Sequence, residues 1–490
     1  MKTNTLDFDA QALREKILDL AMRGKLVPQD PNDEPASVLL EKIKAEKEQL
    51  IKEKKIKKSK PLAPITDDEK PFDIPDSWEW VRLGDVITIL RGGSPRPIKK
   101  YLTDDPQGIN WIKIGDSKPN SKYIEYAAEK IIPEGLSKTR IVSKGDFLLS
   151  NSMSFGRPYI LKINGAVHDG WLILSDYDHL FNKDYLYYLL SSGFINTQFM
   201  NLATGSTVKN LNRERVANTI AVVPPLKEQS RIAAKIAQLF ALLRKVESST
   251  QQYAKLQTLL KSKVLDLAMR GKLVEQDTHD EPASVLLEKI KAEKAEIVKE
   301  KKIKKSKPLP PITDEEKPFD IPDSWEWVRL GDVYHFVDYR GKTPHKISSG
   351  IRLITAKNVR NGYIKLEPEE FISLEEHKER STRGLINKGD IFITTEAPMG
   401  LVALNNFDEP IATAQRLITL QKVSKYQDSS FAAFQMQSSF FQKELQQKAT
   451  GSTVKGIKAS NLKQVLILIP PLAEQRRTVK KISQVLKLLK

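Results

Sequence analysis

A long stretch of this sequence occurs twice. Residues 13–86 return as residues 260–333, and 62 of the 74 aligned positions carry the same amino acid. Self-similarity of this extent indicates a tandem duplication. Because near-identical sequences adopt the same structure, the chain has to contain one fold twice, and its function has to make use of both copies.

Constant and divergent segments alternate along the duplication. Residues 87–202 and 334–448 barely match each other, apart from scattered points such as KGD at 144–146 and 388–390. Two shorter segments return nearly unchanged: ATGSTVK at 203–209 and 449–455, and VPPLKEQ at 223–229 as IPPLAEQ at 469–475. A constant frame with two divergent modules indicates that each module meets a different surface.

The charge of the chain indicates which kind of partner surface the modules bind. The 490 residues carry a net charge of +17, with a pI near 9.5. A basic excess of this size attracts polyanions, among which nucleic acid is the leading candidate. An alternative stays open for the lysine-rich segments 52–60 and 299–307, which solvated helix ends explain equally well.

The sequence has no cysteine, so disulfides, cysteine-ligated metal sites and a thiol nucleophile are excluded. A reducing cytoplasm fits this composition best. Residues 1–10 lack the apolar core of a signal peptide, and no apolar run approaches the roughly 18 residues that span a bilayer. We therefore expect a cytoplasmic protein without membrane contact.

Residues 226–270 contain no Gly or Pro and predict one long helix, which would extend roughly 65 to 70 Å at 1.5 Å per residue. Apolar residues recur at spacings of three and four, which predicts one buried seam as in a coiled coil. The seam residues are Ile232, Ile236, Leu239, Leu243, Val246, Tyr253, Leu260, Val264 and Leu267.

A second copy of this helix is divided between the two ends of the chain. Residues 473–490 match its first half, and residues 13–24 match its second half. Accidental truncation explains this less well, because the missing half is present at the other end. We infer a circularly closed, pseudo-twofold tandem repeat in which the terminal helices meet. The predicted fold class is α+β, with two α/β domains joined by long antiparallel coiled-coil helices.

Short segments mark the borders of the predicted domains. Residues 36–50 and 283–297 have amphipathic helix patterns, and the proline-bearing segments 61–65 and 308–312 follow them. Each WEWVRLGD segment then predicts a first strand whose tryptophans pack in the core. The expected domains are N-terminal helices at 1–60, a first module at 61–224, a central helical region at 225–307, a second module at 308–470 and a C-terminal helix at 471–490.

Catalytic and cofactor motifs are missing from the sequence. GSTVK at 205–209 lacks the P-loop pattern, and HExxH, GxSxG and a dinucleotide fingerprint do not occur. The six histidines form no repeated ligand pair. The ProAsp pairs at 75–76 and 322–323 are better explained as turns than as an acidic nuclease cluster. We expect no catalytic residue, metal or cofactor in this chain.

The divergent modules carry hydrogen-bonding side chains on predicted loops. RGGSPRP at 91–97 and RGKTPHK at 340–346 are turn-forming, and SNSMSFGR at 150–157 faces TTEAPMGL at 394–401 in the other copy. Arg favours guanine, Asn favours adenine and Glu accepts from cytosine, so these differences fit two modules that recognise different bases. Loop drift between duplicated domains is the alternative. The candidate DNA-contacting residues are Arg91, Arg96, Lys99, Lys113, Asp116, Lys118, Asn151, Ser152, Ser154, Arg157, Arg340, Lys342, Thr343, Lys346, Lys357, Asn358, Thr394, Thr395 and Glu396.

The repeated GSTVK loop differs in kind, because it is identical in both copies. Hydroxyls, backbone amides and a lysine hold phosphate without distinguishing bases. A polar turn before the next strand is an equal alternative. The predicted backbone-contacting residues are Ser206, Thr207, Lys209, Ser452, Thr453 and Lys455.

Taken together, the chain resembles the specificity subunit of type I restriction-modification enzymes. The resemblance rests on WEWVRLGD, TGSTV, PPLxxEQ and LDLAMRGKLV, each present twice in the order of the family, and covers essentially the whole chain. It implies a non-catalytic subunit whose two recognition domains bind a split double-stranded DNA sequence and whose helices dock two methyltransferase subunits. S-adenosylmethionine, ATP and Mg²⁺ would then belong to those partners and to the restriction subunits.

Two other classes of function remain open. A free-standing DNA-binding regulator would have no use for the amphipathic surfaces at 36–50 and 283–297. A self-contained nuclease or methyltransferase would be active as a purified chain with metal or methyl donor.

Overall fold

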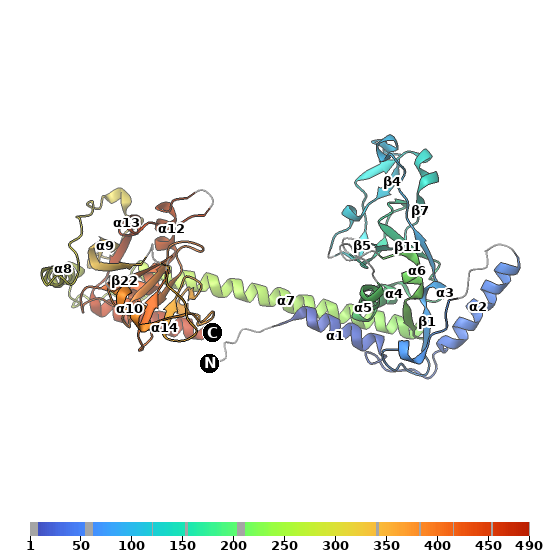
Figure 1. Cartoon of the computed structure of the whole chain (residues 1–490), viewed down its shortest axis with the longest axis horizontal. Helices are drawn as coiled ribbons and strands as arrows, with labels where there is room; N and C mark the ends of the chain where they lie inside the picture. Colours follow the sequence, from blue (N-terminus) through green and yellow to red (C-terminus); the bar gives the residue numbers. More distant parts are fainter. Residues whose placement is uncertain are drawn as a thin grey trace. The chain divides into compact units, whose positions relative to one another are not determined.

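The computed structural model describes residues 8–53, 62–119, 121–151, 155–202, 211–339, 343–381, 384–414, 416–451 and 454–489. The chain divides into two compact units, a first unit of residues 6–250 and a second unit of residues 251–490. Their border falls inside α7 (Leu226–Met269), a single helix of 44 residues. The helix predicted at 226–270 is therefore confirmed (Figure 1).

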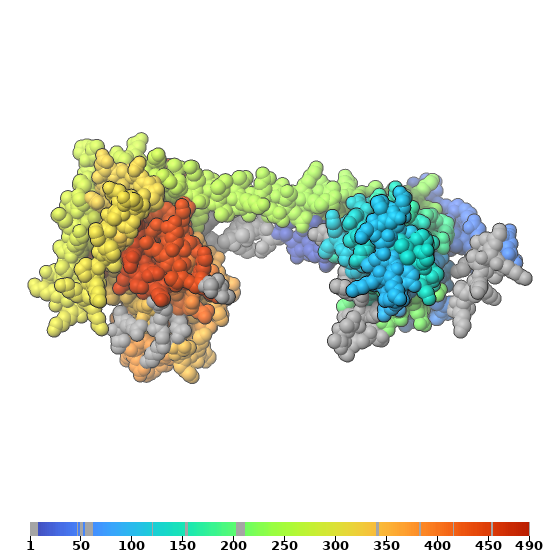
Figure 2. Space-filling model, turned by 90° about the horizontal axis from the view of Figure 1, so that it is seen from above, coloured from blue at the N-terminus to red at the C-terminus, as the bar shows by residue number. Residues whose placement is uncertain are grey.

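The first unit combines helices with three sheets. Besides its part of α7, the helices of the first unit are α1 (Ala10–Met22), α2 (Ala36–Lys52), α3 (Leu83–Val86), α4 (Lys183–Leu190), α5 (Gly193–Leu202) and α6 (Arg213–Asn218). One sheet pairs β1 (Glu79–Arg82) with β12 (Ile220–Val223). A second has the order β2 (Thr88–Arg91), β11 (Trp171–Ser175), β8 (Phe147–Ser150), β9 (Pro158–Leu161), β5 (Tyr123–Ile124). The third has the order β3 (Leu102–Thr103), β6 (Glu129–Ile131), β4 (Ile109–Ile112), β10 (Gly165–Val167), β7 (Arg140–Val142). The part of the chain that carries β3, β4 and β6, coloured light blue to cyan, faces the viewer in Figure 2.

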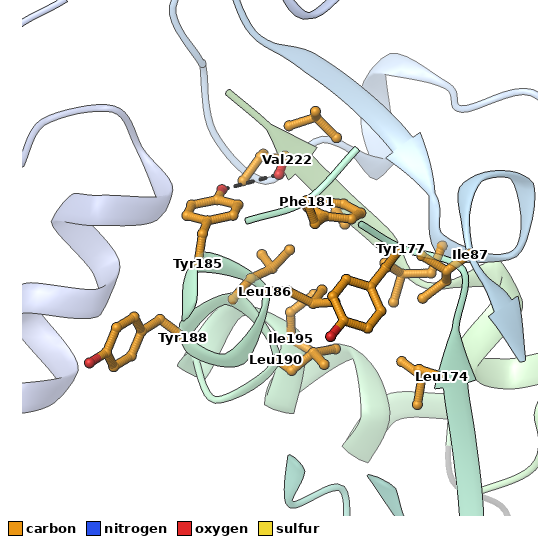
Figure 3. Packing of buried hydrophobic residues seen from close by; sticks show 14 of the residues in the cluster. Ile87, Leu174, Tyr177, Phe181, Tyr185, Leu186, Tyr188, Leu190, Ile195 and Val222 are labelled. Atoms are coloured by element: carbon orange, nitrogen blue, oxygen red, sulfur yellow. Dashed lines mark hydrogen bonds between the residues drawn. The ribbon is translucent and has the colours of Figure 1, made fainter. Parts of the chain in front are cut away.

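The sheet that contains β8 and β11 is buried on both faces. Alternate side chains of a strand point to opposite sides, so Leu149 and Leu172 pack with the helices while Leu148 and Ile173 pack with the third sheet. Figure 3 shows the helix side, where the Tyr185 hydroxyl of α4 donates to a β12 carbonyl at 3.1 Å. Because both faces are covered, the loops at the strand ends are left to contact a ligand.

The second unit repeats this plan. Its helices are α8 (Ala283–Lys299), α9 (Leu330–Val333), α10 (Leu374–Arg380), α11 (Ser429–Met436), α12 (Ser439–Gln447), α13 (Ala459–Leu462) and α14 (Leu472–Leu488). β13 (Glu326–Arg329) pairs with β23 (Leu466–Ile469). The larger sheets have the orders β14 (Tyr334–Asp338), β22 (Leu417–Lys422), β19 (Ile391–Thr394), β20 (Val402–Leu404) and β18 (Phe371–Ile372), β15 (Ile351–Ile354), β21 (Ile411–Thr413). β16 (Val359–Arg360) pairs with β17 (Tyr363–Ile364).

Each unit also contains an antiparallel pair of helices. In the first unit, Arg14 of α1 pairs with Glu247 of α7, whereas Gln29, beyond the other end of α1, donates to Glu228 at the start of α7 at 2.7 Å. The second unit pairs α14 with the last part of α7, and Gln257 donates to the backbone at the C-terminal end of α14. The antiparallel coiled-coil prediction is thus confirmed inside each unit. The predicted meeting of the terminal helices stays a prediction.

The buried seam predicted along α7 is present only at the two ends of the helix. Ile232, Ile236 and Val264 are buried, but Val246 and Tyr253 are 44% and 54% exposed. The reason is that the partner helices α1 and α14 pack against the end parts of α7. The prediction of one continuous buried seam is wrong for the middle of the helix.

The WEWVRLGD segments divide into two elements. Residues 79–82 and 326–329 form the predicted strands, but the following LGDV residues form the short helices α3 and α9. The prediction of a strand to the end of this segment was therefore too long.

Candidate nucleic-acid interface

A buried carboxylate fixes a long helix to each module. In the first unit, the Trp78 indole and the Gln29 amide both donate to Glu228, at 2.9 and 2.7 Å. The second unit repeats both contacts at Glu474, with Trp325 as the indole donor. Burial raises the pKa of both carboxyl groups, and the donors oppose this rise. Both tryptophans are 3% exposed, so their predicted core role is confirmed.

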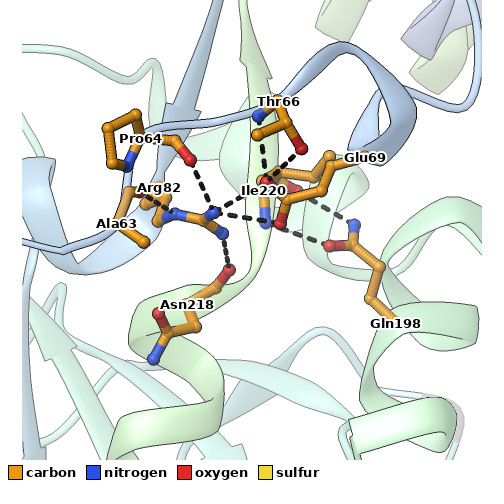
Figure 4. A network of polar contacts seen from close by, with 8 residues as sticks. All are labelled: Ala63, Pro64, Thr66, Glu69, Arg82, Gln198, Asn218 and Ile220. Atoms are coloured by element: carbon orange, nitrogen blue, oxygen red, sulfur yellow. Dashed lines mark hydrogen bonds and ion pairs between the residues drawn. The ribbon is translucent and has the colours of Figure 1, made fainter.

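A repeated arginine fixes the proline-bearing segments to the modules (Figure 4). The buried Arg82 of β1 donates to the carbonyls of Ala63 and Asn218, at 2.6 and 2.8 Å, and pairs with Glu69 at 2.9 Å. Arg329 makes the equivalent contacts in the second unit. Because a buried charge is costly unless it is paired, these contacts hold each module in the same way on its frame.

Three loops of the first module meet at Asp169. Ser94 donates to the Asp169 carboxylate at 2.9 Å, and the Arg96 guanidinium lies 3.6 Å from it. The Asp169 carbonyl accepts from the Asn151 amide at 2.9 Å and from Arg91 at 3.4 Å. The structure therefore brings Arg91 and Arg96, which the sequence placed on one loop, together with Asn151 of another loop.

The members of this cluster differ in exposure. Asn151 is 3% exposed, whereas the Arg96 side chain is 82% exposed. Arg91 is also exposed. A Cβ on Gly92 would lie 2.2 Å from the His168 carbonyl oxygen, so only glycine allows the loop to approach this closely. Asn151 holds the loops together, and the two arginines face solvent.

The next candidates of the first module lie before β3 and after β4. The Asp116 carboxylate accepts from the Lys113 backbone N–H at 2.7 Å, and this bond closes a turn. The same carboxylate also accepts from a second backbone N–H. The Lys113 ammonium donates to Glu129. Lys99 and Lys118 are exposed, and neither forms an ion pair with the described residues.

The second module builds a cluster in the same backbone register. The backbone N–H of Thr395 donates to the Arg416 carbonyl at 2.9 Å. The backbone N–H of Asn151 donates in the same way to the Gly170 carbonyl at 3.0 Å. The structure thus aligns residues 150–157 with residues 394–401 as the sequence comparison did. The two loops differ in side chains while sharing one backbone frame.

The side chains of this second cluster form another set of contacts. Glu396 pairs with Arg416 at 2.8 Å. The buried Thr394 hydroxyl donates to a carbonyl of its own loop at 2.7 Å. Gly456 forms β-bridges to Thr450 and to Glu396, which brings the exposed Lys455 to the same edge.

The other candidates of the second module fall into two classes. Asn358 is 1% exposed and donates to carbonyls of the loop that follows it, and Lys346 pairs with Glu370 at 2.8 Å. Thr343 and Lys357 are exposed. Arg157 of the first module is exposed. The remaining candidates lie outside the described residues: Ser152, Ser154, Ser206, Thr207, Lys209, Arg340, Lys342, Ser452 and Thr453.

Comparison with known proteins decides the family. The family described as the type I restriction modification DNA specificity domain matches residues 75–257 and 322–490. The chain belongs to this family. The specificity subunits of two type I restriction enzymes of Escherichia coli, EcoAI and EcoEI, are 32% and 30% identical to it, each aligned over 98% of this chain and 89% of the relative.

A solved structure shows the same fold for this specificity-family chain. A chain from a type I restriction-modification system, 20% identical, superposes with a TM-score of 0.55 over 86% of this chain and 92% of that chain. Two specificity domains, a mixed α and β content and a long central helix are therefore established.

Sequence reasoning missed several residues of the specificity domains. Asp169 and Arg416 belong to no motif, and their contacts form only when separate loops meet. Arg82 and Arg329 did carry a signal, because both stand in the identical WEWVRLGD segment.

The described residues include no group of three or more His, Cys, Asp or Glu side chains that could hold a metal ion. No described helix is both long and apolar enough to cross a membrane.

Proposed function

We propose that this chain is the DNA sequence-recognition subunit of a type I restriction-modification enzyme and that its two modules recognise different halves of a bipartite, asymmetric target. One observation carries this proposal: two loop clusters share a backbone register but hold different side chains, with Asn151 and Asp169 in one and Glu396 and Arg416 in the other. Bases are distinguished by the donors and acceptors presented to their edges. Different side chains on one frame therefore support different half-sites.

Exposed cations of the two modules support contacts to phosphates. Such contacts supply much of the affinity for DNA without distinguishing sequence. Asn151, Asn358, Thr394 and Thr395 are buried and position the loops in this proposal. The residues proposed to contact the DNA directly are Arg91, Arg96, Lys99, Lys118, Lys357, Glu396 and Lys455.

The chain acts here as a non-catalytic cytoplasmic subunit that directs two methyltransferase subunits and the restriction subunits to its target. Those partners supply S-adenosylmethionine, ATP and Mg²⁺ chemistry. The exposed apolar side chains in the middle of α7 support a helix surface for partners, since Leu256 and Leu259 are 55% and 66% exposed.

The decisive experiment is methylation mapping in cells that express this chain with its neighbouring methyltransferase. The expected result is one split, asymmetric motif that is methylated only when both proteins are present. No such motif from a confirmed complex would overturn the proposal. Sequence-specific binding by the chain alone, without any bound methyltransferase, would favour a free-standing regulator.

Two variants assign the parts of the motif. Replacing residues 87–202 with the matching segment of a relative should change one half-site only. Inserting residues in the middle of α7 should lengthen the gap between half-sites, expected near one helical turn or about 34 Å, without changing either half-site. A mutant that keeps its spacing or changes its bases would contradict the assigned role of α7.

A further inference from the structure

A groove of about 1000 Å³ lies inside the first unit. Its walls come from α1, α4, α7 and the loop of residues 155–158. Figure 1 shows these three helices together in the first unit, where α1 contacts α4. Four cationic side chains line the groove: Arg14, Lys122, Arg157 and Arg244.

Two of these cations are neutralised and two are not. Arg14 forms a two-bond ion pair with Glu247, and Lys122 pairs with Asp184. Arg157 and Arg244 are exposed, and neither has an ion pair among the described residues. The groove therefore offers two free guanidinium groups, and such groups favour phosphate oxygens.

Aromatic side chains line the same groove. The Tyr188 ring lies 5.8 Å from the Phe240 ring of α7 and 5.5 Å from the Tyr187 ring. Figure 3 shows Tyr188 pointing away from Tyr177 and the rest of the core cluster. Burial raises the pKa of Tyr188 to about 12, so its hydroxyl stays protonated and is a hydrogen-bond donor at neutral pH.

The second unit does not repeat this chemistry. α4 and α11 are equivalent helices, since Asn182 and Asp428 cap them at the same position. In this register Tyr187 corresponds to Ala433, and the shared loop register places Leu401 where the first unit has Arg157. The part of the groove that the first module contributes, Tyr187 and Arg157, is therefore not repeated in the second unit.

We propose that this groove binds phosphates of the DNA strand next to the half-site of the first module, with Arg157 and Arg244 as the phosphate-binding residues. This inference rests on the proposed function. Continuity supports DNA as the occupant, because Arg157 ends the same loop that carries Asn151 in the candidate interface. A free mononucleotide would present the same phosphate chemistry, and the test distinguishes the two.

The first measurement is the salt dependence of DNA binding by the complex of this chain with its methyltransferase. Neutralising a phosphate contact lowers the slope of log K against log salt by about 1. Arg244→Gln should show this decrease, and the double variant Arg157→Gln, Arg244→Gln should lower the slope by about 2. Lys245→Gln is the matched control, since Lys245 is the next residue of α7 and does not line the groove. An unchanged slope in the double variant overturns the proposal.

The second measurement replaces single phosphates with uncharged methylphosphonates on either side of each half-site. The wild-type complex should lose affinity for replacements beside the half-site that module exchange assigns to residues 87–202. The double variant should lose clearly less affinity than the wild type for at least one of these replacements, and it should keep the wild-type response beside the other half-site. Identical profiles of the wild type and the double variant, or a change of the profile beside the other half-site only, overturn the proposal.

A titration of the same complex with inorganic phosphate and deoxynucleoside monophosphates distinguishes DNA from a free nucleotide as the source of the bound phosphate. Saturable mononucleotide binding that Arg244→Gln abolishes, together with insensitivity to methylphosphonates, assigns the groove to a free nucleotide and overturns DNA as the occupant. Failure of the proposed function is distinguishable, because the wild-type complex would then show no preference for any bipartite sequence.

Discussion

The two loop clusters place opposite charges on equivalent turns. In the first module, the turn of residues 168–170 carries Asp169, which gathers Ser94, Arg96 and Asn151. In the second module, the equivalent turn carries Arg416, which pairs with Glu396 of the facing loop. Both turns accept the same backbone hydrogen bond from that loop. The frame determines where the loops lie, and the side chains determine what charge each module presents.

The contacts below these clusters show no such difference. The carboxylates Glu228 and Glu474, with their tryptophan donors, and the arginines Arg82 and Arg329 make the same bonds in both units. We call these shared contacts the supports of the loops, and the divergent loops are thus held by the same supports in both units. Three predictions test whether the supports are equivalent and whether the loops differ as described.

The largest effect is expected from removing the buried indoles. Trp78→Ala and Trp325→Ala should each destabilise their own unit by about 3–5 kcal/mol, because a cavity forms and a buried carboxylate loses its donor. Hydrogen exchange resolved by unit measures this, since a protein with two units does not unfold in one step. Tyr126→Ala is the control, because Tyr126 is 70% exposed. A small effect in one unit alone would show that the supports are not equivalent.

The pH dependence of stability tests the same carboxylates. Their pKa values are raised by burial in the folded state, so the folded protein binds more protons than the unfolded chain between the ordinary and the raised pKa. Their contribution to stability should therefore be highest at low pH and fall as pH rises through this window.

Glu228→Gln and Glu474→Gln should each remove part of this fall, since an uncharged amide has no such titration. Denaturant unfolding of both variants and the wild type, at a series of pH values above the ordinary glutamate pKa of about 4.3, checks the result. Parallel curves for variant and wild type would contradict the assigned role.

The smallest effect is expected at the Glu396–Arg416 pair, whose side chains are 43% and 58% exposed. Glu396→Arg and Arg416→Glu should each weaken recognition at the second half-site only. The double variant with both residues exchanged should restore the ion pair. Its coupling free energy should be about 0.2–1 kcal/mol, the range of exposed ion pairs. A double-mutant cycle on the unfolding of the second unit measures it, with methylation of the first half-site as the internal control. Altered methylation at both half-sites would show that the modules do not act separately.

Local patterns predicted the repeated parts of this molecule well. The long helix at 226–270, the first strands at residues 79–82 and 326–329 and the buried tryptophans follow from helix spacing and aromatic patterning. The continuous seam along α7 was wrong because spacing cannot show where a partner helix ends. Asp169 was missed because its importance depends on loops that are distant in the sequence.

The sequence by itself determined the duplication, the matched supports and the membership of the family, because these depend on residue identity and on short-range pattern. Only the tertiary structure decided which polar loop residues face solvent. Arg96 and Asn151 look equally available in the sequence, but the first is 82% exposed at its side chain and the second is 3% exposed. The physical reason is that burial depends on the packing of loops against strands far along the chain. A buried amide forms its hydrogen bonds with those packed loops and is not available to a ligand.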